Sequence, residues 1–190
     1  MSLHRYRAAM AVLASISVCL LMAAAPAMAD TGLGAHKLEG AWVAKVIGAP
    51  GQWSYVVTAD PSGKRASAYG NIDAGLNLEA ILGPVFEPAD HSSPLLIETV
   101  MQDRNTAKYY CVYYGLKTLA LPSPVNAEIV YIGVVKGTLE FTAPGKAKGT
   151  HNFEMYYPSQ DKDGDGFPDE DETTPFVFQL LTNDTRLPSP

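Results

Sequence analysis

The segment KYYCVYYG, residues 108–115, carries aromatic or apolar side chains on both faces of an extended strand, because successive side chains of a strand point to opposite sides. The segment AEIVYIGVV, residues 127–135, has the same property. A sheet with one solvated face would alternate apolar and polar residues. Either these strands are central in a two-layer core, or one of their faces lines an apolar cavity. The packed core is favoured, because large aromatic side chains usually fill cores.

Around these two segments, about nine short segments show the alternation and the β-branched or aromatic enrichment that are typical of strands. The ranges are 40–47, 52–59, 64–72, 94–102, 106–117, 126–135, 137–142, 150–157 and 174–182. Turn residues separate them. Pro61 and Gly63 suit a type I turn, and we expect turns at KG, 136–137, and at APGKAKG, 143–149.

One segment, DAGLNLEAILG at 73–83, has the pattern of a helix, and the tail at 183–190 is expected to be flexible. Strands spaced about every 8–12 residues with short turns are typical of antiparallel all-β folds. We therefore predict a single all-β domain of about eight or nine strands, either an antiparallel barrel or a sandwich.

Residues 1–29 have the features of a cleavable signal peptide. Arg5 and Arg7 precede an apolar run over 8–24, and a small-residue AMA sequence ends the segment. The run is shorter than the roughly 20 residues that span a bilayer. We expect an exported domain over 30–190, secreted, periplasmic or on the cell surface, without a transmembrane segment after cleavage.

The charge of the chain is concentrated in one place. The chain carries 20 acidic against 14 basic residues, and seven of the acidic residues fall within DKDGDGFPDEDE, 161–172. The remainder is almost balanced and has no basic stripe, so a nucleic-acid partner is not expected. Cys19 lies in the leader, which leaves Cys111 without a partner for an intramolecular disulfide. We expect Cys111 to be a buried, inert thiol.

The acidic segment has the spacing of a twelve-residue calcium loop. Carboxylates occupy its first, third, fifth, ninth and twelfth positions, glycine the sixth, and a backbone carbonyl would serve at the seventh. The predicted ligands are Asp161, Asp163, Asp165, Phe167 through its carbonyl, Asp169 and Glu172, with Gly166 at the turn. Calcium is favoured over zinc because the segment has neither Cys nor His.

The residues that flank this loop are those of strands. Pro158 would break an entering helix, and Pro175 is followed by β-forming residues. The loop is therefore expected to be a hairpin insertion. It resembles the DxDxDGxPD loops of thrombospondin type 3 repeats and other EF-hand-like calcium loops, over twelve residues, in a single copy and without flanking cysteines. The resemblance implies calcium binding and an exported location.

Near the predicted mature start, Gly40-Ala41-Trp42 resembles the G-x-W start of lipocalin-like barrels. In that family the tryptophan closes one end of the barrel, and the resemblance implies an apolar ligand cavity. An ordinary core position for Trp42 is the alternative.

The remaining candidate residues point to no defined chemistry. Asp90, His91 and Ser92 are the residue types of a hydrolase triad, but adjacency in one loop does not give triad geometry. His36 and His151 are expected to be surface histidines. Asn183 begins a glycosylation sequon, which matters only in a host that modifies exported proteins in this way.

Taken together, these features predict an exported calcium-binding β-domain that holds a small apolar ligand without catalysis. A surface or adhesive module rigidified by calcium is the first alternative, and a small-barrel enzyme of unknown reaction is the second. The ligand and the oligomeric state are left open.

Overall fold

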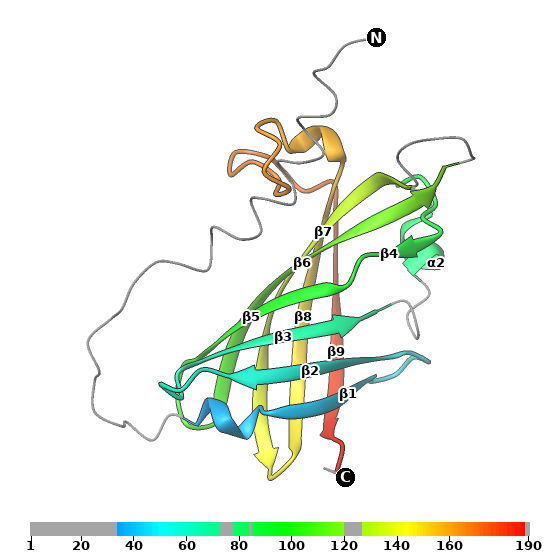
Figure 1. Ribbon diagram of the computed structural model, residues 1–190. Helices are drawn as coiled ribbons and strands as arrows, with labels where there is room; N and C mark the ends of the chain where they lie inside the picture. The colour runs from blue at the N-terminus through cyan, green and yellow to red at the C-terminus, as the bar shows by residue number, and fades with distance from the viewer. Residues whose placement is uncertain (1–33, 73–77, 84, 120–126, 189–190) are drawn as a thin grey trace.

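The protein is a closed antiparallel β-barrel (Figure 1). The computed structural model describes residues 34–72, 78–83, 85–119 and 127–188. The described strands are β1 (Gly40–Val46), β2 (Gln52–Ala59), β3 (Arg65–Asn71), β4 (His91–Ser92), β5 (Leu95–Met101), β6 (Thr106–Thr118), β7 (Ala127–Ala143), β8 (Lys146–Tyr156) and β9 (Phe176–Arg186). The short helices are η1 (Ala35–Lys37), α2 (Leu78–Leu82) and η2 (Pro158–Gln160). None of the helices in the described ranges is long and apolar enough to span a bilayer.

The barrel is a meander in which each strand pairs with its neighbours in the chain. Omitting β4, the hydrogen-bonded order runs from β1 through β2, β3, β5, β6, β7 and β8 to β9, and β9 pairs with β1. The two-residue strand β4 is added to the outer end of β6, where His91 and Ser92 pair with Leu116 and Gly115. Of the two predicted architectures, barrel and sandwich, the structure has the barrel.

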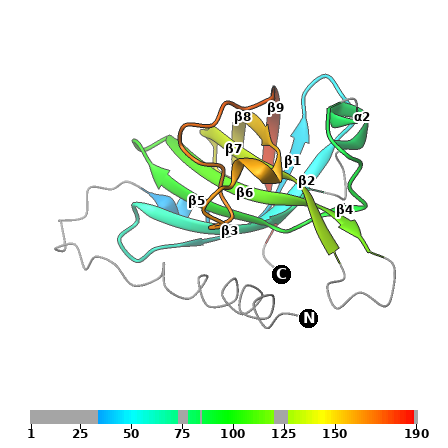
Figure 2. The same cartoon turned by 90° about the horizontal axis from the view of Figure 1, so that it is seen from above.

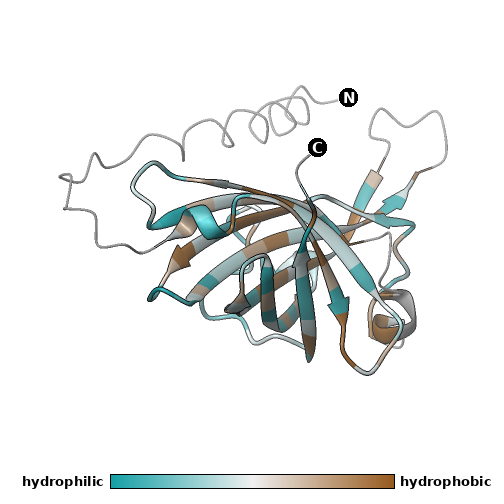
Figure 3. Ribbon diagram, turned by 90° about the horizontal axis from the view of Figure 1, so that it is seen from below, coloured by the Kyte–Doolittle hydropathy of each residue, from teal (hydrophilic) through white to brown (hydrophobic). Residues whose placement is uncertain are grey.

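Alternation along the strands places one row of side chains inside the barrel and one outside. In β2, Trp53, Tyr55 and Val57 are buried while the residues between them are exposed. The same alternation of buried and exposed residues runs along β3, and Figure 3 shows apolar and polar segments along the strands. A barrel of this strand number has an interior just wide enough for side chains or one small ligand.

Strands β6 and β7 are held together by rings that lie over glycines. Tyr109 is opposite Gly137, Tyr113 is opposite Gly133, and Tyr131 is opposite Gly115. A Cβ on Gly133 would lie 2.3 Å from the Tyr113 ring. These glycines therefore leave room for the aromatic rings, as in the rescue of strand glycines by cross-strand aromatics.

The turn predicted at 136–137 is wrong. Lys136 and Gly137 lie within β7, where they pair with β6 on one side and β8 on the other. The two predicted strands at 126–135 and 137–142 are one strand, of which Asn126 lies outside the described residues. Gly137 accommodates the Tyr109 ring and does not end the strand.

Two other boundaries differ from the prediction. The turn at 143–149 is confined to its first residues, since β8 begins at Lys146. The tail predicted to be flexible from 183 begins with ordered strand: β9 continues to Arg186, and Asp184 is buried inside the barrel. The predicted helix at 73–83 is observed over Leu78–Leu82, and its residues 73–77 lie outside the described ranges.

The two ends of the barrel are covered by different segments, with η1 at one end and α2 at the other (Figures 1 and 2). Trp42 is fully buried, donates its indole N–H to the Leu38 carbonyl just after η1 at 2.7 Å, and stacks on Tyr55. At the other end, Phe86 packs edge-on against Tyr131. Trp42 is thus a core residue that also fixes the segment at one end.

The outer face of β6, β7 and β8 carries a second apolar cluster, made of Val112, Ile132, Val134 and Tyr156. Tyr114 packs against it and donates its hydroxyl to the carbonyl of Gly166, in the acidic segment, at 3.0 Å. Strands β6 and β7 are therefore apolar on both faces because the inner face lines the barrel and part of the outer face lies beneath the acidic segment.

Candidate functional site

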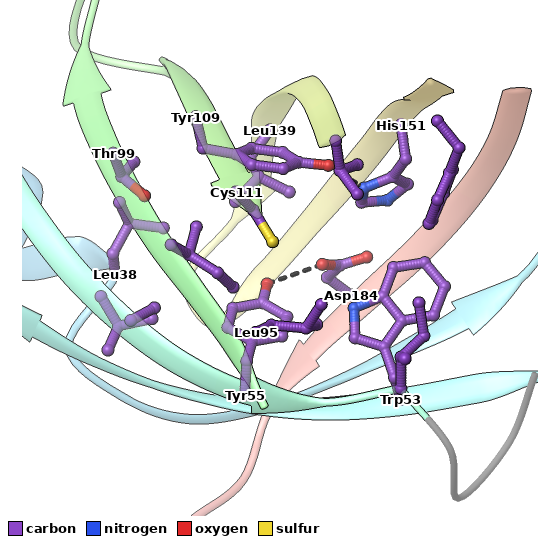
Figure 4. A pocket seen from close by; sticks show the side chains of 16 residues that line it. Leu38, Trp53, Tyr55, Leu95, Thr99, Tyr109, Cys111, Leu139, His151 and Asp184 are labelled. Atoms are coloured by element: carbon purple, nitrogen blue, oxygen red, sulfur yellow. Dashed lines mark hydrogen bonds between the residues drawn. The ribbon is translucent and has the colours of Figure 1, made fainter. Parts of the chain in front are cut away.

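The interior of the barrel contains a cavity of about 40 Å³ (Figure 4). Its walls come from β2, β3, β5, β6, β7, β8 and β9, together with Leu38 after η1 and Ile72 after β3. Most wall residues are apolar, and the polar ones include Thr99, Tyr109, His151 and Asp184. One water molecule needs about 10–15 Å³ of cavity volume measured in this way. The cavity therefore has room for about three groups of the size of a water molecule.

A chain of hydrogen bonds crosses the interior from β2 to β6. The Tyr55 hydroxyl donates to Asp184 Oδ2 at 2.6 Å, as Figure 4 shows, and the Thr182 hydroxyl donates to Asp184 Oδ1 at 2.5 Å. His151 Nε2 lies 2.7 Å from Thr182 Oγ1, and His151 Nδ1 bonds to the Tyr109 hydroxyl.

One assignment of protons satisfies every member of this chain. Because Thr182 gives its proton to Asp184, its oxygen accepts from His151 Nε2–H. The other ring nitrogen, Nδ1, then accepts the Tyr109 proton. In this arrangement His151 is neutral and Asp184 is an ionised acceptor. Both Asp184 distances fall in the range of hydroxyls bound to carboxylates.

Burial perturbs each titrating member of the chain. It lowers the pKa of His151 to about 4, so the ring is neutral at neutral pH. Burial raises the pKa of Asp184, against the opposing effect of the hydrogen bonds from Thr182 and Tyr55. The pKa of Tyr55 is raised well above its ordinary value, first by burial and then by the nearby Asp184 charge.

Gly149 leaves room for the hydrogen bond between His151 and Thr182. Gly149 pairs with Thr182 across β8 and β9, and His151 follows two residues later on the same face. A Cβ on Gly149 would lie 2.3 Å from both His151 Nε2 and Thr182 Oγ1. The hydrogen bond between His151 and Thr182 therefore depends on the absence of a side chain at this position.

Cys111 points into the same cavity and is 2 % exposed. Burial raises the pKa of its thiol to about 12. The predicted buried thiol is confirmed, and at neutral pH it stays protonated and unreactive.

The acidic loop brings together three of the six predicted calcium ligands. One carboxylate oxygen each from Asp161, Asp163 and Asp165 lies within 4.8 Å of the others. The backbone N–H groups of Gly164 and Gly166 donate to Asp161, and both glycines have positive φ. The loop is thus wound around the Asp161 side chain.

The other predicted ligands have different partners. Asp169 Oδ2 accepts the Lys162 backbone N–H at 2.7 Å. Glu172 pairs with the Lys162 ammonium group and accepts from Gln160 Nε2. The N–H of Phe167 donates to Asp165 Oδ1. Asp169 and Glu172 therefore lie outside the three-carboxylate cluster.

Several predictions about single residues can be compared with their positions. His36 is exposed, as expected. The prediction for His151 is wrong, because it is 4 % exposed and lies in the cavity wall. Asp184 and Thr182 were missed. The signal that could have found them is the alternation that continues from Phe176 to Asp184 along β9.

The Asp90, His91 and Ser92 group has a structural place. Asp90 accepts the Thr118 backbone N–H at 2.6 Å, and this bond lowers the pKa of Asp90. His91 and Ser92 form β4. Asn183, in the sequon, is exposed on the outer face of β9.

No protein-family model and no curated protein matches the chain. Among solved structures, the chain is similar to one described as "Structure of EF1p2_mFAP2b bound to DFHBI", with 17% sequence identity and a TM-score of 0.41, over 82% of this chain and 97% of that chain. At this level of similarity, the comparison adds nothing to the barrel topology described above.

Proposed function

We propose that this chain is an exported, non-catalytic binding protein that holds a small, largely apolar molecule inside its barrel. The observation that carries the proposal is the cavity inside the barrel, whose wall is mostly apolar and includes a few polar groups. Small-molecule sites have this composition: apolar surface supplies affinity, and a few placed polar groups fix orientation. Tyr55, Asp184, His151 and Tyr109 are joined to one another through the hydrogen-bond chain, so their positions in the wall are fixed.

The size of the cavity limits the ligand. Room for about three water-sized groups corresponds to a molecule of roughly three or four non-hydrogen atoms. A larger ligand would require side chains at an end of the barrel to move, for example Leu38, which lies after η1 and contributes to the wall.

Tryptophan signals offer a direct test of binding. The protein has two tryptophans, Trp53 in the cavity wall and Trp42 outside it, whose indole N–H is bonded to Leu38. In ¹⁵N-labelled protein, isopropanol or dissolved xenon should shift the Trp53 indole signal to saturation and shift the Trp42 signal much less. Trp53→Phe assigns the two signals.

A matched pair of variants places the binding inside the barrel. Ala68→Leu adds side-chain volume at the cavity wall, whereas Ser67→Leu makes a comparable addition on the exposed face of the same strand. Ala68→Leu should abolish the Trp53 response, and Ser67→Leu should retain it. An Ala68→Leu variant that keeps the saturable Trp53 response would refute binding inside the barrel.

We also propose that the loop 161–172 binds Ca²⁺, as its spacing predicts. The proximity of Asp161, Asp163 and Asp165 supports this, because hard cations take clustered carboxylate oxygens. Asp169, Glu172 and the Phe167 carbonyl would complete the shell, and Glu172 would exchange Lys162 for the ion. Because Tyr114 bonds to Gly166, the ion would also fix the loop against the barrel. Export rests on the leader-like segment 1–29.

A further inference from the structure

Asp184 is a buried carboxylate that forms no ion pair with any of the described residues. It is 1 % exposed, and its two oxygens each accept a hydrogen bond from a neutral hydroxyl, Tyr55 or Thr182. None of the described residues in the cavity wall is Lys or Arg. His151, one bond beyond Thr182, is neutral because burial lowers its pKa to about 4. A buried charge is costly unless an opposite charge accompanies it.

The groups that surround this carboxylate are aromatic. Trp53, Tyr55, Tyr109 and Phe153 contribute to the same wall, and Trp53 meets His151 edge-on with 4.8 Å between ring centroids. Figure 4 shows Asp184 between Tyr55, Trp53 and the His151 side of the cavity. Aromatic side chains beside a carboxylate attract organic cations, through the ring quadrupole and the charge together.

Other charged ligands fit this wall poorly. An anion would be repelled by Asp184. Calcium requires six to eight oxygen ligands, and the polar wall around Asp184 supplies one carboxylate and hydroxyls that already donate to it. An alkylammonium group needs fewer partners, because its carbon atoms contact the apolar wall while its N–H groups donate to Asp184.

We propose that the ligand of this cavity is a small organic cation, an amine of about three or four non-hydrogen atoms, whose ammonium group binds Asp184. This inference rests on the proposed binding function and specifies the chemical class of the ligand. Asp184 is already removed from water in the folded protein. Binding therefore requires desolvation of the amine alone, and in return both buried charges gain a partner.

The test compares three ligands of equal size. Isopropylammonium, isopropanol and acetate each have four non-hydrogen atoms and differ in charge. They are titrated at about pH 8, where an alkylamine remains protonated, with the Trp53 indole signal as readout. The cation should bind at least about tenfold more tightly than the alcohol, as expected for hydrogen bonds to a charged group. Acetate should not bind.

Two variants assign the preference to Asp184. Asp184→Asn keeps the shape of the side chain and removes its charge, so the cation should lose its advantage over the alcohol. Glu98→Gln removes one charge from the exposed face of β5 and should leave the preference unchanged. The ligand comparison in the unmodified protein decides the question even if Asp184→Asn does not fold.

The outcomes separate the two proposals. If isopropanol binds at the cavity and isopropylammonium binds no more tightly, the inference about the cation is wrong and the binding function stands. The inference is equally wrong if Asp184→Asn keeps the preference. If none of the three ligands, nor xenon, shifts the Trp53 signal, both proposals fail.

Discussion

Gly149 controls the hydrogen-bond chain through the absence of a side chain. Gly149→Ala would place a methyl group 2.3 Å from both His151 Nε2 and Thr182 Oγ1, and neither of these buried, hydrogen-bonded side chains can easily move away. We expect a loss of about 2–4 kcal/mol in the free energy of unfolding, from overpacking together with a broken buried hydrogen bond.

Urea unfolding of Gly149→Ala tests this loss. The control is Gly34→Ala, where the added methyl meets the flexible Lys37 side chain, so the change should stay within about 0.5 kcal/mol. Equal urea midpoints for Gly149→Ala and the unmodified protein would show that the buried hydrogen-bond chain does not depend on this glycine.

His151 should make the fold sensitive to acid. Its pKa is about 4 in the folded protein, against an ordinary value of 6.5. The unfolded chain therefore binds a proton between pH 6.5 and 4 while the folded protein does not, and stability falls as the pH is lowered through this window. The full contribution is about 3 kcal/mol.

Asp184 acts in the opposite direction, because burial raises its folded pKa and favours its protonated form. The effect of His151 is therefore measured by comparing the pH dependence of the free energy of unfolding in His151→Gln and in the unmodified protein. The loss of stability between pH 6.5 and 4 should be smaller in His151→Gln than in the unmodified protein. His36→Gln, at an exposed position, is the control. Parallel curves for all three proteins would contradict the expected effect.

These residues also show where reasoning from the sequence was limited. The types and positions of His151 and Asp184 are visible in the sequence, but their burial depends on which strands face each other. His151 lies in a strand, predicted from 150, with polar neighbours Thr150 and Asn152. In the closed barrel, β9 lies between β8 and β1. This arrangement turns the faces of β8 and β9 that carry His151 and Asp184 toward the interior.

At the scale of elements, the acidic loop is the clearest prediction from the sequence. Calcium that binds only the folded protein at a hundredfold excess over its Kd stabilises it by about 2.7 kcal/mol. For a domain of this size, the melting midpoint should rise by about 5–10 °C. The measurement is thermal melting with calcium, with magnesium and with chelator.

The loop offers a matched pair of variants. Asp165→Ala removes a member of the three-carboxylate cluster and should abolish most of the calcium-dependent shift. Glu170→Ala removes the same charge from a position outside the ligand pattern and should preserve it. Identical midpoints in calcium, magnesium and chelator would mean that the loop is a solvated acidic turn.

Strand positions were predicted well because their signal is local. The predicted range 52–59 is β2 itself, and 106–117 differs from β6 by one residue. The error at 136–137 has a different origin. A glycine that admits a ring from the neighbouring strand has the same sequence signal as a glycine in a turn, and the pairing of Gly137 with Tyr109 is not a local property.

At the scale of the whole molecule, the attachment of the loop to the barrel can be tested through Tyr114. Its hydroxyl bond to Gly166 joins the acidic segment to the outer face of β6. Tyr114→Phe removes this bond and keeps the ring in the apolar cluster. We expect a smaller calcium-dependent rise in the melting midpoint than in the unmodified protein.

Tyr110→Phe is the matched control for this experiment, because the Tyr110 ring lies on the same outer face and is 39 % exposed. It should retain the full calcium effect. An unchanged calcium effect in Tyr114→Phe would show that the loop responds to the ion independently of the barrel.

The all-β antiparallel class was predictable from the number and spacing of strands. The choice between barrel and sandwich was not, because both give the same alternation along each strand. The difference lies in the pairing of β1 with β9, which joins segments distant in the sequence.

The pairing of β1 with β9 also bears on the time at which the molecule becomes complete. As the chain is synthesised from its amino end, β1 to β8 can pair in order, but β1 and β8 keep bare edges until β9 emerges. A half-made sheet with bare edges is prone to pair with other chains. Thr182 and Asp184 arrive on that same closing strand. For a chain exported as we propose, the ligand chamber would exist only after the last strand has left the translocation channel.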